Sequence, residues 1–405
     1  MNFIGINDSY AIINLAANAM FGEDASLTAH DTSSFVAVGE KMLRTGYEST
    51  LNALSLVYGD IIADGQKYVG KLRIFNEDND RFGAIIRKIR FYAKPFEASE
   101  NFNTIQNPNT LDDGNSVDHY KISKKYPLEL NFIALQTLKY RYTNWEDQLD
   151  IAMRSPEEFA RYSSEKMIEI ANDIETGYEA KRRLLLQNAI GATYNTGTAR
   201  QNVNLRVAFN NENGTAYSVN DLLTTYKAEF YAFMIERIKG DMQLMEERNT
   251  LFHIYPARND DSGNALVYPT FTRPEDRRMV LYMPLIRKAE ANVLPALFGP
   301  DYLRLENYEG VEYWSDPVNN PSAVSVTPNQ LDAATGASVT GNAVALDYVV
   351  GLLFDKKALA TTLKFEKART TPINADGGYY NTVISWLYQN MYDACENMIL
   401  YYLAD

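Results

Sequence analysis

The sequence predicts an α+β fold, in which helices and most strands come from separate stretches of the chain. Three observations carry this prediction. A long amphipathic helix follows Ser155, two extended segments flank a polar loop between residues 70 and 130, and apolar strand-like runs follow residue 344.

Residues 1–34 mix short apolar pieces with turn residues, a pattern that suits an arm lying over other structure. Residues 40–58 predict a helix, because apolar side chains recur every three or four positions between flanking glycines. The predicted apolar face of this helix consists of Leu43, Tyr47, Leu51, Leu54 and Tyr58.

Residues 82–99 and 121–132 predict the arms of an extended hairpin, whose tip at 100–119 is rich in Asn and Asp. In the second arm Leu128, Leu130 and Phe132 alternate with polar residues, which is the period of a half-covered strand. An isolated two-stranded ribbon is marginally stable in water. We therefore expect a neighbouring copy to support these arms, which points to a protein that assembles.

Residues 156–188 predict a long helix. Ser155 can cap its first amides, Pro156 suits the first helical position, and Glu157 and Glu158 favour the positive end of the helix. At about 1.5 Å per residue this helix is roughly 50 Å long and can act as a spine. Gly177 predicts a bend or a close contact within it.

Ser218 and Asp221 predict the start of a second helix, which ends near residue 238. Buried strands are expected at 278–283 and 311–314, with a short helix at 285–293 between them.

Residues 315–342 are enriched in Asn, Ser, Thr, Gly and Pro, which predicts a surface excursion or a small strand insertion. Strands are expected at 344–354, 362–367 and 379–388. Gly377 and Gly378 supply the turn between the last two.

Length and composition bound the class of protein. At 405 residues, 46% of them hydrophobic, the chain is long enough for one large domain or two to three smaller ones. The net charge of -13 argues against a sequence-independent nucleic-acid binder, which needs a positive face. The local basic run from Arg87 to Arg90 is interpreted as a solvated strand face.

The sequence gives no sign of an oxidising compartment or a membrane. Its one cysteine, Cys395, allows no intrachain disulfide and is expected to pack as a small, inert apolar group. The start lacks the pattern of a secretory signal, and the longest apolar run, 344–354, is too short to span a bilayer. We expect a soluble protein made in a cytoplasm.

A search for chemistry finds no catalytic, cofactor-binding or metal site. The histidines His30, His119 and His253 lie far apart, and His253 is expected to be a structural or partly buried side chain. Residues 259–264 resemble a calcium loop but lack its ligand spacing, so a solvated turn is expected. No phosphate-binding or dinucleotide-binding glycine pattern occurs. Abundant carboxylates leave a glycosidase-like pair open as an alternative.

Tyrosine is enriched, with 28 residues in all. A dense set lies near the end of the chain, and large amphipathic rings suit both cores and protein interfaces. The tyrosines of this set are Tyr379, Tyr380, Tyr388, Tyr392, Tyr401 and Tyr402.

Four segments carry a family resemblance, spread over most of residues 35–400. They are 35–43 (FVAVGEKML), 82–89 (FGAIIRKI), 140–143 (YRYT) before the long helix, and 349–359 (VVGLLFDKKAL) followed by 377–380 (GGYY). In these segments and in the order of its elements, the chain resembles the major capsid protein of tailed bacteriophages, with the Hong Kong 97-type fold. The small podophage head proteins are the nearest version.

The resemblance implies a domain organisation. Residues 1–45 would form an N-terminal arm, 70–130 an extended hairpin loop, and 218–354 with 389–405 an axial domain. Residues 46–69, 131–217 and 355–388 would form a peripheral domain containing the spine helix at about 155–190. The chain departs from some relatives, because we find no helical pro-segment, no partner set for covalent crosslinking and no added immunoglobulin-like domain.

The resemblance also implies a structural role and no enzymatic activity or cofactor. Copies of the chain would form hexamers and pentamers of a virion capsid, assembled in the host cytoplasm. The shell would enclose double-stranded DNA without sequence-specific binding, with scaffolding and portal proteins as partners and no membrane. Another phage virion structural protein is the further alternative. The candidate inter-subunit contacts in the hairpin are Arg87, Lys88, Arg90, Tyr92, Phe96, Phe102, His119 and Tyr120.

Overall fold

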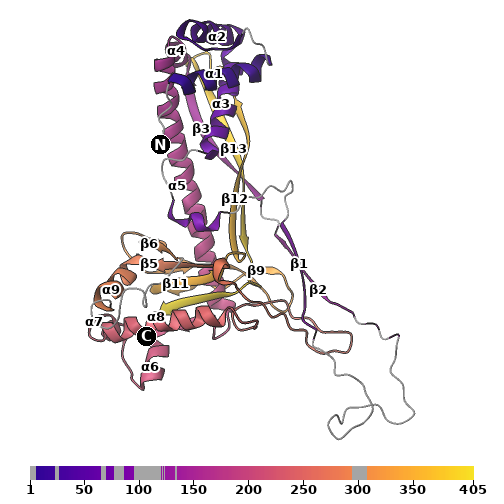
Figure 1. The fold of residues 1–405 in the computed structure, drawn as a ribbon, viewed down its shortest axis with the longest axis vertical. Helices are drawn as coiled ribbons and strands as arrows, with labels where there is room; N and C mark the ends of the chain where they lie inside the picture. The colour runs from indigo at the N-terminus through magenta and orange to yellow at the C-terminus, as the bar shows by residue number, and fades with distance from the viewer. Residues whose placement is uncertain are drawn as a thin grey trace. The chain divides into compact units, whose positions relative to one another are not determined.

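A computed structural model of the chain describes residues 6–22, 27–64, 70–76, 86–94, 120, 122, 124–132, 135–293 and 308–405. Contacts divide the chain into two compact units. Unit 1 comprises Met1–Ala84, Ala134–Leu186 and Leu359–Tyr392, and unit 2 comprises Ile85–Ile133, Gln187–Ala358 and Asp393–Asp405. The predicted α+β class is confirmed, because both units combine helices with strands (Figure 1).

Unit 1 begins with helices α1 (Ile6–Phe21), α2 (Thr32–Thr45) and α3 (Tyr47–Asp64). Ile13 and Phe35 are fully buried in the core of this unit, and the assignment of residues 1–45 to an N-terminal arm stays a prediction. The prediction of one helix over 40–58 is wrong, since Gly46 with φ 149° separates α2 from α3. That left-handed region suits glycine and interrupts the helix.

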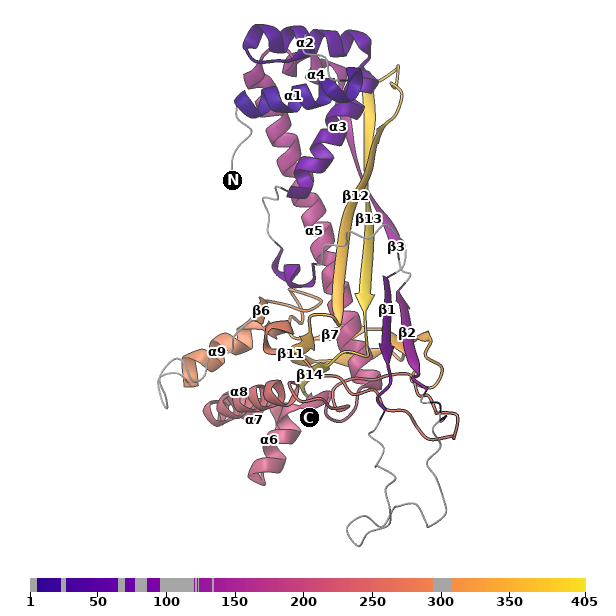
Figure 2. The same cartoon turned by 45° about the vertical axis from the view of Figure 1, so that its right-hand side comes forward.

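Unit 1 contains a three-stranded antiparallel sheet in the order β12-β13-β3. These strands are β12 (Leu359–Thr370), β13 (Tyr379–Tyr392) and β3 (Leu135–Trp145), and Figure 2 shows them side by side. The strands predicted at 362–367 and 379–388 are therefore confirmed, and both are longer than expected. Gly378, at φ 60°, lies in the turn between them.

The helix predicted at 156–188 is confirmed as α5 (Pro156–Thr196), after the short helix α4 (Glu146–Ala152). Ser155 Oγ accepts a hydrogen bond from the Glu158 amide at 3.2 Å, as the capping pattern predicted. Its 41 residues make a rod of about 60 Å. The close contact predicted at Gly177 is not found, because no atom lies within 4 Å of a Cβ placed there.

Buried charges on α5 hold the 3-10 turn η2 (Lys71–Phe75) within unit 1. Glu175 Oε1 accepts the Gly70 amide at 3.1 Å, and Glu179 Oε2 accepts the Leu72 amide at 3.2 Å. Arg182 Nη1 pairs with Glu175 Oε1 at 2.9 Å, and both side chains are essentially inaccessible. This cluster fixes the chain ahead of the hairpin.

Unit 2 is built on a five-stranded sheet in the order β4-β14-β11-β5-β6. Its central pairs are antiparallel and its two outer pairs are parallel. Gly351 in β11 is required by close packing, because a Cβ there would lie 2.5 Å from Leu281 Cδ2. The strands are β4 (Asn202–Asn204), β5 (Arg277–Tyr282), β6 (Tyr308–Val311), β11 (Tyr348–Asp355) and β14 (Met398–Leu403).

Two small antiparallel pairs, β7-β10 and β8-β9, also belong to unit 2. They are β7 (Val324–Val326), β8 (Asn329–Leu331), β9 (Ser338–Thr340) and β10 (Val344–Leu346), so the predicted insertion at 315–342 contains strands. The unit's helical segments are α6 (Leu205–Asn213), α7 (Val219–Thr224), α8 (Lys227–Leu244), η3 (Pro274–Asp276) and α9 (Met283–Val293).

The predictions for unit 2 are confirmed with three corrections. Strand β5 and helix α9 occur where expected, but the helix after Ser218 is two helices, α7 and α8. The strand predicted at 344–354 is likewise two, β10 and β11. Strand β6 ends at Val311, whereas Trp314 is buried and donates its Nε1–H to Val349 O at 2.9 Å.

None of the helices in the described residues is long and apolar enough to cross a bilayer.

Candidate functional site

Strands β1 (Ile86–Phe91) and β2 (Pro127–Phe132) form an antiparallel ribbon in unit 2, with Arg90 opposite Leu128 (Figures 1 and 2). The predicted hairpin arms are confirmed for this part of the chain. The predicted tip and the candidates Phe96, Phe102 and His119 lie outside the described residues, so these positions stay predictions.

The ribbon has two different faces. On the inner face Leu128 is buried, and Lys88, Arg90 and Leu130 are partly covered. On the outer face Ile89 and Phe91 are each 54% exposed. The inner face packs on its own unit, so part of the ribbon's support comes from the same chain, and the expected support from a neighbouring copy stays a prediction. The outer face is left without cover by the described residues.

An ionic cluster holds the inner face. Lys88 Nζ lies 2.9 Å from Asp393 Oδ2, and Arg90 Nη2 lies 3.0 Å from the same oxygen. Arg90 Nη2 also pairs with Glu396 Oε1. The interpretation of this basic run as a solvated face is therefore wrong for Lys88 and Arg90. It is right for Arg87, which is 57% exposed and pairs across the ribbon with Glu129.

Burial dominates the electrostatics of this cluster. It raises the pKa of Glu396 to about 7, and the positive charge of Arg90 opposes the shift only in part. Burial by itself would lower the pKa of Arg90, but Asp393 and Glu396 outweigh it and the pKa is raised. Arg90 therefore stays charged, and its buried Nη1 has no acceptor among the described residues.

Aromatic side chains cover the other end of the inner face. Tyr92 and Leu128 pack with Tyr268 and Cys395, and Tyr92 donates its hydroxyl hydrogen to Pro256 O at 2.6 Å. Cys395 is fully buried, as predicted for a small apolar group, and burial raises the pKa of its thiol. A thiol in this state is a weak nucleophile.

His253 is buried beside this cluster, which confirms the prediction of a structural histidine. Its Nε2–H donates to Tyr268 O at 2.6 Å, because a carbonyl oxygen can only accept. Burial lowers the pKa of His253, so the neutral ring is favoured. Through this bond His253 positions the strand-like segment that carries Tyr268.

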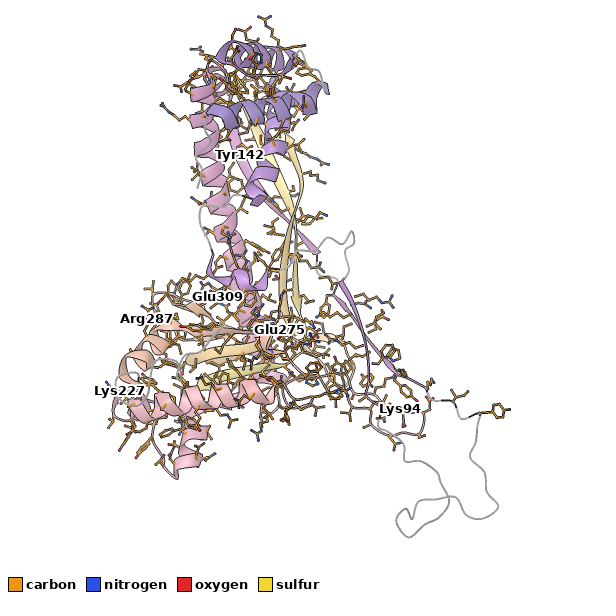
Figure 3. All side chains as sticks on the ribbon, in the orientation of Figure 1. Lys94, Tyr142, Lys227, Glu275, Arg287 and Glu309 are labelled. Carbon is orange, nitrogen blue, oxygen red and sulfur yellow. The ribbon has the colours of Figure 1, made fainter. Side chains whose placement is uncertain are left out.

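A cavity of about 530 Å³ lies beside β1 in unit 2. Its lining includes Lys88, Ile89 and Arg90 from the ribbon. It also includes Tyr268, Phe271 and Arg273 from residues 267–273, which we call the covering segment. Lys94, labelled in Figure 3, follows the ribbon strand β1 at the end opposite Ile86. Of the remaining candidates, Tyr120 is 91% exposed.

The described residues contain no group of His, Cys, Asp or Glu side chains that could hold a metal ion. In the predicted turn at 259–264, Asp260 Oδ1 accepts the amides of Ser262 and Asn264 at 2.9 and 2.7 Å. The carboxylate is thus engaged in closing the turn.

The sequence reasoning missed Asp393, Glu396 and Tyr268. A signal was present for the acids, because Asp393 and Glu396 lie in a short polar break between two strongly apolar strands. Charged residues in such a break need a partner when buried. The alternating Lys88 and Arg90 on β1 are the matching cations. No signal in the sequence pointed to Tyr268.

No protein-family model and no curated protein matches the sequence. The solved structures to which the chain is similar include the capsid of Staphylococcus phage Andhra, at 10% identity and a TM-score of 0.48, covering 82% of this chain and 83% of that one. The capsid of cyanophage P-SCSP1u is similar at 13% identity and a TM-score of 0.43, covering 84% of this chain and 90% of that one. The mature capsid of bacteriophage PhiM1 is similar at 13% identity and a TM-score of 0.41, covering 84% and 89%.

Proposed function

We propose that this chain is a major capsid protein of a tailed bacteriophage. Copies assemble into hexamers and pentamers that form a closed shell around packaged double-stranded DNA, with scaffolding and portal proteins as partners. The proposal combines the resemblance of the sequence with the geometry of the β1-β2 ribbon.

One observation carries the proposal: the ribbon is fixed to its own unit on one face and uncovered on the other. Ile89 and Phe91 are each 54% exposed on the outer face. Within the described residues the only strand that β1 pairs with along its length is β2. A strand pair that exposes two large apolar side chains beside the Arg87–Glu129 ion pair, with open edges among the described residues, is suited to pair with another chain.

The test replaces the outer apolar pair and measures assembly by sedimentation velocity. Ile89→Thr with Phe91→Thr keeps strand-forming side chains, so we expect a folded protein that assembles only at concentrations at least tenfold higher. The control is Val318→Thr, which changes an 82% exposed apolar side chain outside the ribbon. Shells formed by the double variant at the unchanged concentration would contradict the proposed role of the ribbon.

A further inference from the structure

The cavity beside β1 marks a break in strand pairing. The Ala93 amide donates to Val267 O at 2.7 Å, in an antiparallel bridge between the end of the first hairpin arm and the covering segment. In antiparallel pairing Ile89 would then lie opposite Phe271. Both residues line the cavity instead. The two segments therefore separate after the bridge, and the cavity occupies the space where strand pairing would have continued.

The acidic and basic side chains that line this cavity differ in their exposure to solvent. Of the three acids in the lining, Asp355 and Glu396 are buried, at 3% and 5% exposed, and Glu396 is paired with Arg90, whereas Asp276 is half-buried. The exposed charged residues of the lining are Arg273 and Lys357, and both are cations. The lining therefore carries four cationic and three acidic side chains, and its two exposed charges are positive, although the whole chain carries a net charge of -13. Arg273 also lies 3.8 Å from the exposed Glu275, which is outside the lining, so Lys357 is the exposed cation of the lining without an acidic partner among the described residues.

Two further features indicate what the cavity accepts. Arg90 is a lining residue whose buried Nη1 has no acceptor among the described residues, so the site has a spare donor for an anion. Ile89 and Phe271 add apolar surface, at 54% and 48% exposed. A carboxylate carried on a partly apolar peptide satisfies both features. A nucleic-acid phosphate would leave the apolar part unused.

We propose that this cavity receives an extended acidic segment from a second copy of the chain. A carboxylate of that segment meets Arg273 and Lys357, and its apolar side chains pack on Ile89 and Phe271. A second copy is the occupant because the positive mouth is complementary to a chain with 52 acidic and 39 basic residues. This inference rests on the proposed function and adds a receiving site to the outer face of the ribbon.

The test reverses the two exposed cations and measures the concentration at which half of the protein is assembled. Arg273→Glu with Lys357→Glu should raise this concentration at least tenfold at low salt. The effect should shrink at about 0.5 M salt, where charges are screened within a few ångströms. The control, Lys139→Glu with Lys227→Glu, makes the same change in net charge at two other exposed lysines, and Lys227 is labelled in Figure 3.

Circular dichroism checks the fold of each variant, and Arg273→Gln with Lys357→Gln replaces the reversal if the latter does not fold. If the wild type assembles and the Arg273 and Lys357 variants reach half assembly at the same concentration, the docking site is overturned and the proposed function stands. An equal effect of the control, or loss of DNA binding with unchanged assembly, would also overturn it. A wild type that stays monomeric would contradict both proposals.

Discussion

Replacing Arg90 by Met tests whether the ionic cluster fixes the ribbon. The substitution removes the guanidinium that pairs with Asp393 and Glu396, whose side chains are 1% and 7% exposed. Breaking a buried ion pair costs about 3–5 kcal/mol, because the remaining charge is left without compensation. Lys88 Nζ stays 2.9 Å from Asp393 Oδ2, so we expect the lower end, about 3 kcal/mol at pH 8.

The same variant should be less destabilised in mild acid. Burial raises the pKa of Glu396 to about 7, so at pH 5.5 this side chain is mostly neutral and loses less when Arg90 is removed. We expect the loss to fall to about 2 kcal/mol. Urea unfolding gives the free energies, and hydrogen exchange of peptides spanning residues 86–94 shows whether the ribbon opens first.

Arg87→Met is the matched control on the same strand. Arg87 pairs with Glu129 at 2.8 Å, but the two side chains are 57% and 42% exposed, so the loss should stay below about 1 kcal/mol. The conclusion that the buried cluster holds the ribbon would be refuted if both variants lost the same free energy of unfolding. It would also be refuted if hydrogen exchange of residues 86–94 became faster in neither variant.

Three further predictions concern single side chains. Between pH 4.5 and about 7 the folded state keeps a proton on Glu396 that the unfolded state releases, so stability falls as pH rises through this window. Glu396→Gln should remove this drop, which is roughly 3 kcal/mol in the wild type. Wild type and variant that lose the same stability over this window in urea unfolding would contradict this. Gly70→Ala should lower the free energy of unfolding by at least about 2 kcal/mol, because its Cβ would lie 2.7 Å from a Glu175 oxygen. Gly177→Ala, where the Cβ meets no atom within 4 Å, should raise it by about 1 kcal/mol. The reverse order of the two variants in thermal unfolding would be evidence against the cluster on α5. Cys395 should resist a thiol reagent until urea unfolds the chain, and rapid native labelling would show that it is accessible.

Local signals predicted the elements that depend on neighbouring residues. Ser155 and Pro156 located the start of α5, and the alternation of Leu128 and Leu130 identified strand β2. The break at Gly46 was missed because the apolar spacing continues across it, and the φ angle of one glycine leaves no trace in that spacing. Apolar spacing shows which side chains of an element are buried, but it does not show which other element packs on them.

The sequence identified the residues that the ribbon contributes to the ionic and aromatic clusters, but not the residues that they contact. Lys88, Arg90 and Tyr92 were identified as hairpin contacts, but their partners within the chain come from more than 150 residues away, as with Asp393. From the sequence alone, a charged residue on a strand is interpreted as exposed to solvent, because its partner is not known. Pairing over such a separation is decided by the tertiary fold and leaves no periodic signal in the sequence.

Electron microscopy of the purified chain, produced with and without a scaffolding partner, tests the central claim most directly. We predict capsomers, sheets or closed shells whose walls repeat one subunit. A chain that remains monomeric at high concentration under both conditions, or that forms fibres or isolated rings, would contradict it.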